Sequence, residues 1–317
     1  MKLRKFDRRL LYHLSHDASL SLTKLAKLMK SSKQLVSYNL NKLVSSGIIS
    51  MFYSVIDHSR LGYIELRVMI RLSQSSPKKE QEVINYLLKK KSIRRVLVVD
   101  DHFDLIVDLV EKDFNNLYEV IISLQEKFGK YIAEIQVDNV RSREMFPFRV
   151  FSENPSKKTD YTRVYYKKAE KPFILDDTDR KIIREIEKNC RFDYVKLSTK
   201  LHIPPKTIMY RIKRLEKERV IAGYGISINW YKLNKVRYRI LIEPLIYNKN
   251  KFVELKDFIR AKEEVIAMKQ VISRYMVEFD IVVSNYNEAL VFLDLIREKF
   301  SELIKGYDIV VIKDIIR

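Results

Sequence analysis

The feature that most constrains the fold of this chain is an internal repeat. Residues 33–44 (KQLVSYNLNKLV) and residues 205–216 (PKTIMYRIKRLE) superpose without a gap when the sequence is shifted along itself by roughly 172 residues. In each segment three apolar residues are spaced four and then three residues apart, which places their side chains in one stripe along a helix. These are Val36, Leu40 and Leu43 in the first copy and Ile208, Ile212 and Leu215 in the second.

The other faces of both helices carry long polar or basic side chains. A short helix with a narrow core stripe and such side chains elsewhere suits the major groove of DNA. An ordinary solvated surface helix is the alternative, but two copies in the same context favour the DNA-binding interpretation. The outward positions are Lys33, Gln34, Ser37, Tyr38 and Asn41 in the first copy, matched by Pro205, Lys206, Met209, Tyr210 and Lys213 in the second.

The charge balance agrees with a polyanionic partner. Lys and Arg number 61 against 41 Asp and Glu, which gives a formal net charge of +20 and a pI near 9.7. Nucleic acid is the commonest partner of such a chain, although charge alone does not choose between DNA, RNA and a membrane surface. No signal peptide is visible and no run approaches the ~20 apolar residues of a membrane span, so we expect a soluble, cytoplasmic protein. Cys190 is the only cysteine, which excludes an intramolecular disulfide and predicts a buried, inert thiol.

Each repeat copy stands third in the order helix, helix, short turn, helix, which is the helix-turn-helix pattern. In the first unit we expect helices at residues 3–15, 21–30 and 33–44, with the hydroxyls of Ser31 and Ser32 capping the third. The β-rich residues 48–56 then predict a hairpin-like wing packed on the helices. The second unit repeats this order from Leu175, with Pro204 and Pro205 at the start of its third helix and a second wing at residues 223–228.

A βαββαβ order follows each winged unit, as in the split-βαβ or ferredoxin-like sandwich. The chain is therefore predicted to be α+β, with two winged helix-turn-helix domains alternating with two ferredoxin-like βαββαβ domains. Phe103-Asp104 and Phe279-Asp280 are placed at matching strand starts. The first copy is predicted to have strands at 64–72, 94–99, 103–110 and 132–140 and helices at 79–91 and 114–128. The second is predicted to have strands at 236–244, 265–273, 276–283 and 307–316 and helices at 251–263 and 286–300.

These elements divide the chain at predicted boundaries. Residues 1–61 and 175–233 are the winged units, residues 62–141 and 234–317 the ferredoxin-like domains, and residues 142–174 a linker. Pro147, Pro155 and Pro172 disfavour a continuous helix in this linker. Its basic run at 161–171 either touches a phosphate backbone or forms a solvated tether.

The second copy contains the motifs Leu175-Asp176-x-x-Asp179, Thr207-Ile208-x-x-Arg211-Ile212-x-x-Leu215-Glu216 and Val220-Ile221-x-Gly223-Tyr224. With these motifs, the order of domains resembles the leucine-responsive regulatory protein and asparagine regulator family of prokaryotic transcription factors. Two consecutive copies of this domain order together cover nearly the whole chain, and the second copy is the more similar to the family. In the first copy Arg4 replaces the Asp of the first motif and Asn39 replaces the Arg of the recognition helix, so identical DNA contacts by the two halves do not follow.

The resemblance also implies a role for the second domain. In the family this domain assembles dimers through its sheet and often binds an amino acid near a Gly-x-x-Asp turn. Asp104 and Asp280 match the Asp positions, but Asp101 and Val277 occupy the Gly positions. Because glycine allows positive φ and close backbone approach, its loss argues against a family-like amino-acid site. Asp101, Asp104 and Asp280 are nevertheless the candidate effector residues.

Residue patterns for catalysis or metal binding are absent from the sequence. The five histidines have no metal-ligand spacing, and the six glycines form no phosphate-binding loop. The acidic cluster Asp100-Asp101-x-x-Asp104 is typical of a turn between strands, and a cation site is the alternative interpretation. We therefore expect no catalytic residues, no metal, no cofactor and no enzyme activity. The same two-domain architecture also resembles the sirohaem decarboxylases, but no His- and Arg-rich tetrapyrrole-binding segment is found in either sandwich domain, where His102 is the only histidine.

The sequence thus predicts a sequence-specific transcriptional regulator that binds double-stranded DNA. One chain can form an internal pseudo-dimer with two unequal half-sites, while a homodimer of tandem chains and an architectural chromosome-coating protein stay open as alternatives. Gln34 and Asn41 can pair with adenine, whereas Lys33, Lys42, Lys206 and Arg214 are assigned to phosphates. The predicted DNA contacts are Lys33, Gln34, Ser37, Tyr38, Asn41, Lys42, Lys206, Thr207, Met209, Tyr210, Arg211, Lys213 and Arg214.

Overall fold

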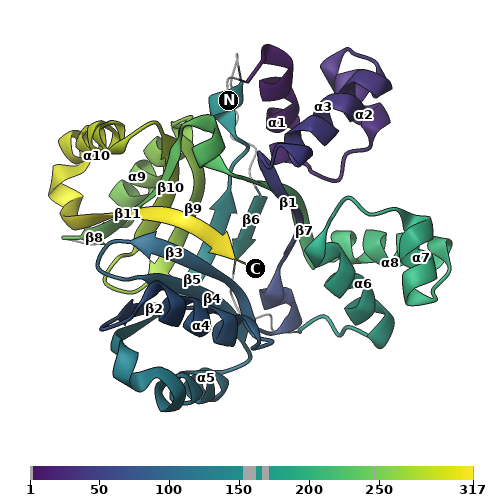
Figure 1. Ribbon diagram of the computed structural model, residues 1–317. Helices are drawn as coiled ribbons and strands as arrows, with labels where there is room; N and C mark the ends of the chain where they lie inside the picture. Colours follow the sequence, from purple (N-terminus) through teal and green to yellow (C-terminus); the bar gives the residue numbers. More distant parts are fainter. Residues whose placement is uncertain (1–2, 153–161, 166–170, 246–247, 317) are drawn as a thin grey trace.

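The computed structural model describes residues 3–152, 162–165, 171–245 and 248–316. Two three-helix units lie beside a β-structure that carries its own helices (Figure 1). In both units the predicted apolar stripe of the third helix is buried. The Ser32 hydroxyl accepts a hydrogen bond from the Leu35 amide at 3.1 Å, which confirms the predicted cap. The helices are α1 (Lys5–His16), α2 (Leu22–Met29) and α3 (Lys33–Ser45) in the first unit, and α6 (Asp177–Lys188), α7 (Tyr194–Leu201) and α8 (Pro205–Lys217) in the second.

The prediction of a hairpin-like wing on each unit is wrong. Each unit contributes a single strand, and β1 (Ile49–Ile56) pairs antiparallel with β7 (Ile221–Ile228) of the other unit. The β1 sequence ISMFYSVI contains no Gly, Pro, Asn or Asp that could turn the chain back on itself, so its ladder partner has to come from elsewhere.

The exchanged strands also pack on the other unit's helices. Ile226 and Ile228 of β7 join the core of the first unit, and Ile56 of β1 joins the core of the second. The buried Ser54 hydroxyl of β1 donates a hydrogen bond to the Ile186 carbonyl of α6 at 2.9 Å. The two units are therefore joined by backbone pairing and by shared cores.

The β-structure confirms the two predicted ferredoxin-like folds. Within each half the four antiparallel strands take the order fourth, first, third, second, and two helices cover one face. The first half comprises β2 (Ile64–Leu72), α4 (Pro77–Leu88), β3 (Ile93–Asp100), β4 (Leu105–Glu111), α5 (Phe114–Phe128) and β5 (Ile132–Met145). The second comprises β8 (Val236–Pro244), α9 (Lys249–Ala261), β9 (Val265–Ile272), β10 (Val277–Val283), α10 (Tyr286–Phe300) and β11 (Ile304–Ile316).

The two sheets join at both edges. Strand β3 pairs with β11 and strand β5 pairs with β9, so the strands from β2 to β5 and from β8 to β11 form a closed ring. Helices α4 and α5 cover the outside of one sheet, and α9 and α10 cover the outside of the other (Figure 1). Along β2, Leu66, Val68 and Ile70 face the helices. The intervening Arg67 and Met69 are also buried, so they face the opposite sheet.

Backbone register corrects one predicted correspondence. The Asp104 amide donates to the Ile70 carbonyl at 3.0 Å, and the Met276 amide donates to the Ile242 carbonyl at 3.1 Å. Ile242 is the repeat counterpart of Ile70, so Met276, not Asp280, is the counterpart of Asp104. Asp280 corresponds instead to Asp108 in the middle of β4, because the two pair with equivalent arginines of β8 and β2. The similar Phe-Asp pairs at 103–104 and 279–280 are four residues out of register.

The predicted linker begins too early. Strand β5 continues to Met145, and β6 (Thr162–Tyr165) pairs with its end. Between them η3 (Arg149–Phe151) packs on the first unit, where Phe151 stacks on Trp230 with ring centroids 5.6 Å apart. Residues 161 and 166–170 of the predicted basic run lie outside the described residues.

Over the described ranges, no helix combines the length and the apolar character that crossing a membrane requires.

Candidate nucleic-acid interface

The outer face of α3 presents most of the side chains predicted from the sequence. Lys33, Gln34, Tyr38 and Asn41 are exposed, while Ser37 and Lys42 are half-buried. Tyr38 is 66% exposed although it is a large aromatic residue. Because the opposite stripe is fixed in the core, the helix cannot turn this face inward without unpacking the unit.

Helix α8 repeats this face in the second unit. Lys206, Met209, Tyr210 and Lys213 are exposed and Thr207 is half-buried. Tyr210 is 65% exposed, closely matching its counterpart on α3. The two helices therefore present an aromatic side chain at the same position, flanked by different polar groups.

Two arginines predicted to contact DNA point elsewhere. The guanidinium of Arg211 contacts Asp176 and lies 3.3 Å from Asp179, and that of Arg214 also contacts Asp179. Asp179 is fully buried near the start of α6, and a buried carboxylate requires paired cations. The hydrogen bond to Asp176 raises the pKa of Arg211. These two arginines hold α8 against α6, apart from the exposed set.

The first unit makes the corresponding contact with different chemistry. The guanidinium of Arg4, at the N-cap of α1, donates to the Asn39 side-chain oxygen and lies 3.2 Å from the Asp7 carboxylate. The Asn39 amide in turn donates to the Leu35 carbonyl at 2.7 Å, and Asn39 is buried. The replacement of an Asp and an Arg by Arg4 and Asn39 is therefore a paired structural change. The paired replacement is visible in the sequence and could have indicated the contact.

Sequence reasoning missed a residue that fixes the units relative to each other. Arg191, between α6 and α7, donates from one nitrogen to the carbonyls of Ala18 and Leu20, each at 2.8 Å, and lies over the Phe52 ring. Burial lowers the pKa of Arg191. The adjacent Cys190 is buried in the core of the first unit, and burial raises the pKa of its thiol to about 12, which agrees with the predicted inert thiol. No pattern along the sequence signals these contacts between units.

The candidate effector residues do not gather at one site. Asp101 is exposed at the turn between β3 and β4 and lines a cavity of about 290 Å³ with Tyr275. Asp104 accepts a hydrogen bond from the Leu72 amide at 2.7 Å. Asp280 lies buried inside the ring of strands, where two arginines hold its pKa well below the usual range. Among the described side chains, no group of three or more His, Cys, Asp or Glu is arranged to hold a metal ion.

Comparison with known proteins supports the assignment of the two helical units. A family model described as winged helix-turn-helix DNA-binding matches residues 3–50 and 175–222. An uncharacterized HTH-type transcriptional regulator of Pyrococcus horikoshii is 46% identical over 63 residues, covering 20% of this chain and 42% of that protein. The leucine-responsive regulatory protein of Haemophilus influenzae is 35% identical over 92 residues, covering 29% of this chain and 55% of that protein. The chain thus spans about half the length of the curated relatives it matches.

A solved structure matches nearly the whole fold. The sirohaem decarboxylase NirDL superposes with a TM-score of 0.62 at 14% identity, covering 98% of this chain and 92% of that chain. At this identity the likeness concerns the fold alone. With both winged units matched and relatives that include the leucine-responsive regulatory protein, the chain carries two winged helix-turn-helix DNA-binding units that are similar to those of such regulators.

Proposed function

We propose that this protein is a DNA-binding transcriptional regulator that reads DNA with α3 and α8. The observation that carries the proposal is the pairing of β1 with β7, which sets two exposed recognition helices in one chain. The net charge of +20 supports an extended contact with phosphates. The relatives named as regulators support the same role.

The proposed contacts differ between the two helices. On α3, Gln34 and Asn41 offer a paired donor and acceptor to adenine, whereas Lys33 binds phosphate. On α8, Lys206 and Lys213 are the exposed cations. Arg211 and Arg214 are not among the proposed contacts, because they form ion pairs with Asp176 and Asp179 at the start of α6. The remaining proposed contacts are Ser37, Tyr38, Lys42, Thr207, Met209 and Tyr210.

Gel shifts with a selected DNA site test these contacts. Gln34→Ala combined with Asn41→Ala should weaken specific binding by ~1–3 kcal/mol per lost base contact and relax the preference at those positions. Gln81→Ala combined with Asn85→Ala is the matched control, because this Gln and Asn lie exposed on α4 and pair with each other at 3.1 Å. Unchanged affinity and preference in the α3 variant would contradict the proposal.

The proposed assembly is an internal pseudo-dimer that binds two unequal half-sites. The exposed faces differ at Ser37 and Met209 and at Asn41 and Lys213, so the half-sites should be a near-palindrome at most. Half-site centres about one helical turn apart, or a multiple of it, are expected for paired helix-turn-helix units. Mass in solution combined with a footprint tests this assembly. A palindromic footprint protected by two chains would favour a homodimer of tandem chains.

Salt dependence separates a regulator from an architectural coating protein. The logarithm of the binding constant should fall by about 0.9 per phosphate contact for each tenfold rise in salt. A regulator should also keep its preference for the selected site when random DNA competes. A coating protein would show the same salt response but lose the site preference under competition.

A second candidate is a sirohaem-decarboxylase-like enzyme, favoured by the fold match and by one cavity. A cavity of about 520 Å³ between β1, β3, β5 and α6 gathers His58 with Arg94, Arg95, Arg143 and Arg184. Sequence reasoning found no such set because its members come from four separate segments. Burial lowers the pKa of His58 to about 3, so its ring is neutral at physiological pH. A shift in Soret absorbance on adding sirohaem that is lost in Arg94→Ala would support this candidate, and an unchanged spectrum would remove it.

A further inference from the structure

The closed ring of strands encloses a set of buried charges. Side chains on the facing surfaces of the two sheets pair across the interior, as Arg67 of β2 does with Asp138 and with Glu278 of the other half. Among the described residues, six cationic side chains contact five carboxylates, so the cationic side chains of this set outnumber the carboxylates by one. The cations are Arg67, Arg95, Arg143, Arg237, Arg239 and Lys269, and the carboxylates are Glu65, Asp108, Asp138, Glu278 and Asp280.

The surplus of cations is concentrated around two carboxylates. Asp108 is shared by three cations, among them Lys269, whose Nζ lies 3.3 Å from each carboxylate oxygen. Asp280 is shared by Arg237 and Arg239, and Arg239 Nε donates to it at 2.7 Å. Arg239 is 1% exposed, and its Nη1 has no hydrogen-bond partner among the described residues. A buried donor without an acceptor destabilises the fold, so an added acceptor here would be bound favourably.

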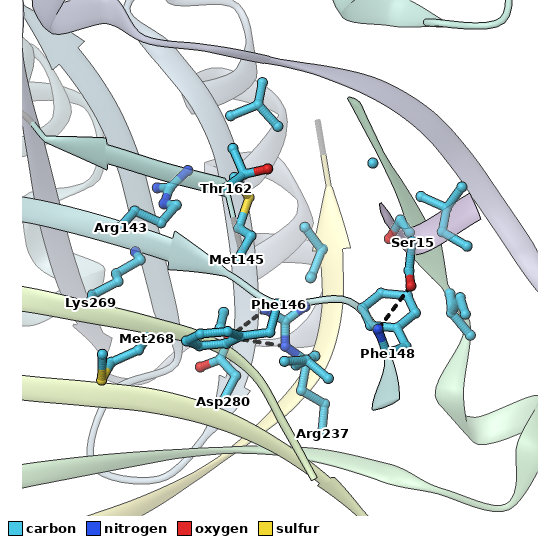
Figure 2. A pocket seen from close by; sticks show the side chains of 18 of the residues that line it. Ser15, Arg143, Met145, Phe146, Phe148, Thr162, Arg237, Met268, Lys269 and Asp280 are labelled. Carbon is cyan, nitrogen blue, oxygen red and sulfur yellow. Dashed lines mark hydrogen bonds and ion pairs between the residues drawn. The ribbon is translucent and has the colours of Figure 1, made fainter. Parts of the chain in front are cut away.

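A cavity of about 80 Å³ opens beside these groups. It is lined by Arg95, Arg143, Arg237, Arg239 and Lys269. A buried water needs far less space, so the cavity has room for a small polyatomic ion. Figure 2 shows Arg143 and Lys269 on one side of the pocket, Ser15 and Phe148 on the other, and Arg237 and Asp280 between them. The charged part belongs to the sandwich, and the other part adjoins the DNA-binding units.

We propose that this cavity binds one small oxyanion, a phosphate or carboxylate group of a metabolite. Arg239 Nη1 and Lys269 Nζ are the donors, with Arg95, Arg143 and Arg237 supplying the surrounding positive field. Charge-assisted hydrogen bonds from guanidinium and ammonium groups are the strong ones in protein recognition of phosphate and carboxylate. The site lies inside the ring of strands, away from the exposed turn of Asp101.

The charge state of Lys269 supports this site. Burial, together with Arg143, Arg239 and Arg95, lowers the pKa of Lys269 to about 7, although Asp108 opposes the shift. The nearby β10 carboxylates Glu278 and Asp280 are themselves held by the arginines of β2 and β8. A bound anion favours the charged ammonium, so binding takes up a proton and should be tighter at pH 6 than at pH 8.

The other wall of the cavity comes from the exchanged strands. Tyr53 of β1 and the β7 residues 225–228 line it, together with Ser15 of α1. Phe148, also in the lining, packs edge-on against Trp230 with ring centroids 5.1 Å apart. If the proposed function holds, an anion here changes the packing of the strands that join the two recognition helices. DNA affinity would then depend on the anion.

Titration of this chain in an amine buffer free of phosphate, sulfonate and carboxylate ions, without DNA, tests the site. Inorganic phosphate and acetate are the two probes, followed by calorimetry and by the fluorescence of Trp230, the single tryptophan. Saturable binding of one anion per chain is expected for at least one probe, and the probe that binds identifies the group. Lys269→Met should weaken binding about tenfold or more. Ala267→Leu, which fills the cavity without changing charge, should also weaken it, and the exposed Lys91→Met should leave it unchanged.

The outcomes are separable from those of the proposed function. Absence of saturable binding by either probe, or equal binding by wild type and Lys269→Met with native circular dichroism, would overturn the site. Gel shifts with and without the bound probe form a separate arm. A phosphate or acetate effect on DNA affinity that disappears in Lys269→Met supports coupling, and an unchanged affinity overturns the coupling alone. Loss of DNA binding by wild type would contradict the proposed function and leave the anion titration intact.

Discussion

Replacing Lys269 by Met should change how stability depends on pH. In the folded protein the pKa of Lys269 is about 7, against 10.5 for an ordinary lysine. Between these values the unfolded chain holds a proton that the folded chain does not, so this residue makes the unfolding free energy rise with pH. Across the full window the contribution amounts to about 5 kcal/mol, and between pH 7 and pH 9 to about 2 kcal/mol.

The assay is urea denaturation of wild type and Lys269→Met at several pH values from 7 to 9. Other groups that titrate in this range cancel in the difference between the two proteins. That difference should change by about 2 kcal/mol, with wild type gaining stability relative to the variant as pH rises. The exposed Lys91→Met serves as the control and should follow wild type in parallel. Parallel curves for wild type and Lys269→Met would show that the ammonium group is not destabilised by its surroundings.

Three further changes test the packing, each by urea denaturation. Arg67→Met leaves two buried carboxylates without their cation and should cost about 3–5 kcal/mol, whereas Arg71→Met on the same strand removes only an exposed pair and should cost under about 1 kcal/mol. Gly225→Ala places a Cβ 2.7 Å from the Tyr53 ring and should cost about 1–3 kcal/mol, whereas Gly306→Ala meets nothing nearer than 3.4 Å and should be nearly neutral. Asp179→Asn removes the anion that pairs with Arg211 and Arg214 and should lower the unfolding free energy by about 2 kcal/mol. For each of the three variants Arg67→Met, Gly225→Ala and Asp179→Asn, an unchanged unfolding free energy would refute the corresponding contact.

Local sequence patterns predicted most elements because the same side chains that mark them also form their cores. The strand at 64–72 and the helix at 114–128 have the predicted bounds. In this strand, Leu66, Val68 and Ile70 share one buried face. The burial of the intervening Arg67 could not be predicted from the sequence, because a polar face against water and a polar face against another charged sheet have the same pattern.

Contacts between distant segments could not be predicted in this way. An eight-residue β-rich segment has the same pattern whether it pairs with its neighbour or with a strand far along the chain, so the exchange of β1 and β7 was missed. The similarity of Phe103-Asp104 and Phe279-Asp280 was misleading because only hydrogen-bond register fixes the correspondence. The exposed recognition faces could be predicted, since the buried stripe determines which side chains remain outside.

The intrachain pairing of β1 with β7, β3 with β11 and β5 with β9 has a consequence for how the protein responds to dilution. Two separate chains that paired through these strands would dissociate as their concentration fell, because association costs translational and rotational freedom. Here both partners share one backbone, so each meets the other at a fixed effective concentration. In the proposed internal pseudo-dimer, the distance between α3 and α8 is therefore independent of protein concentration, and an exchange of halves between two chains would first require breaking the ring.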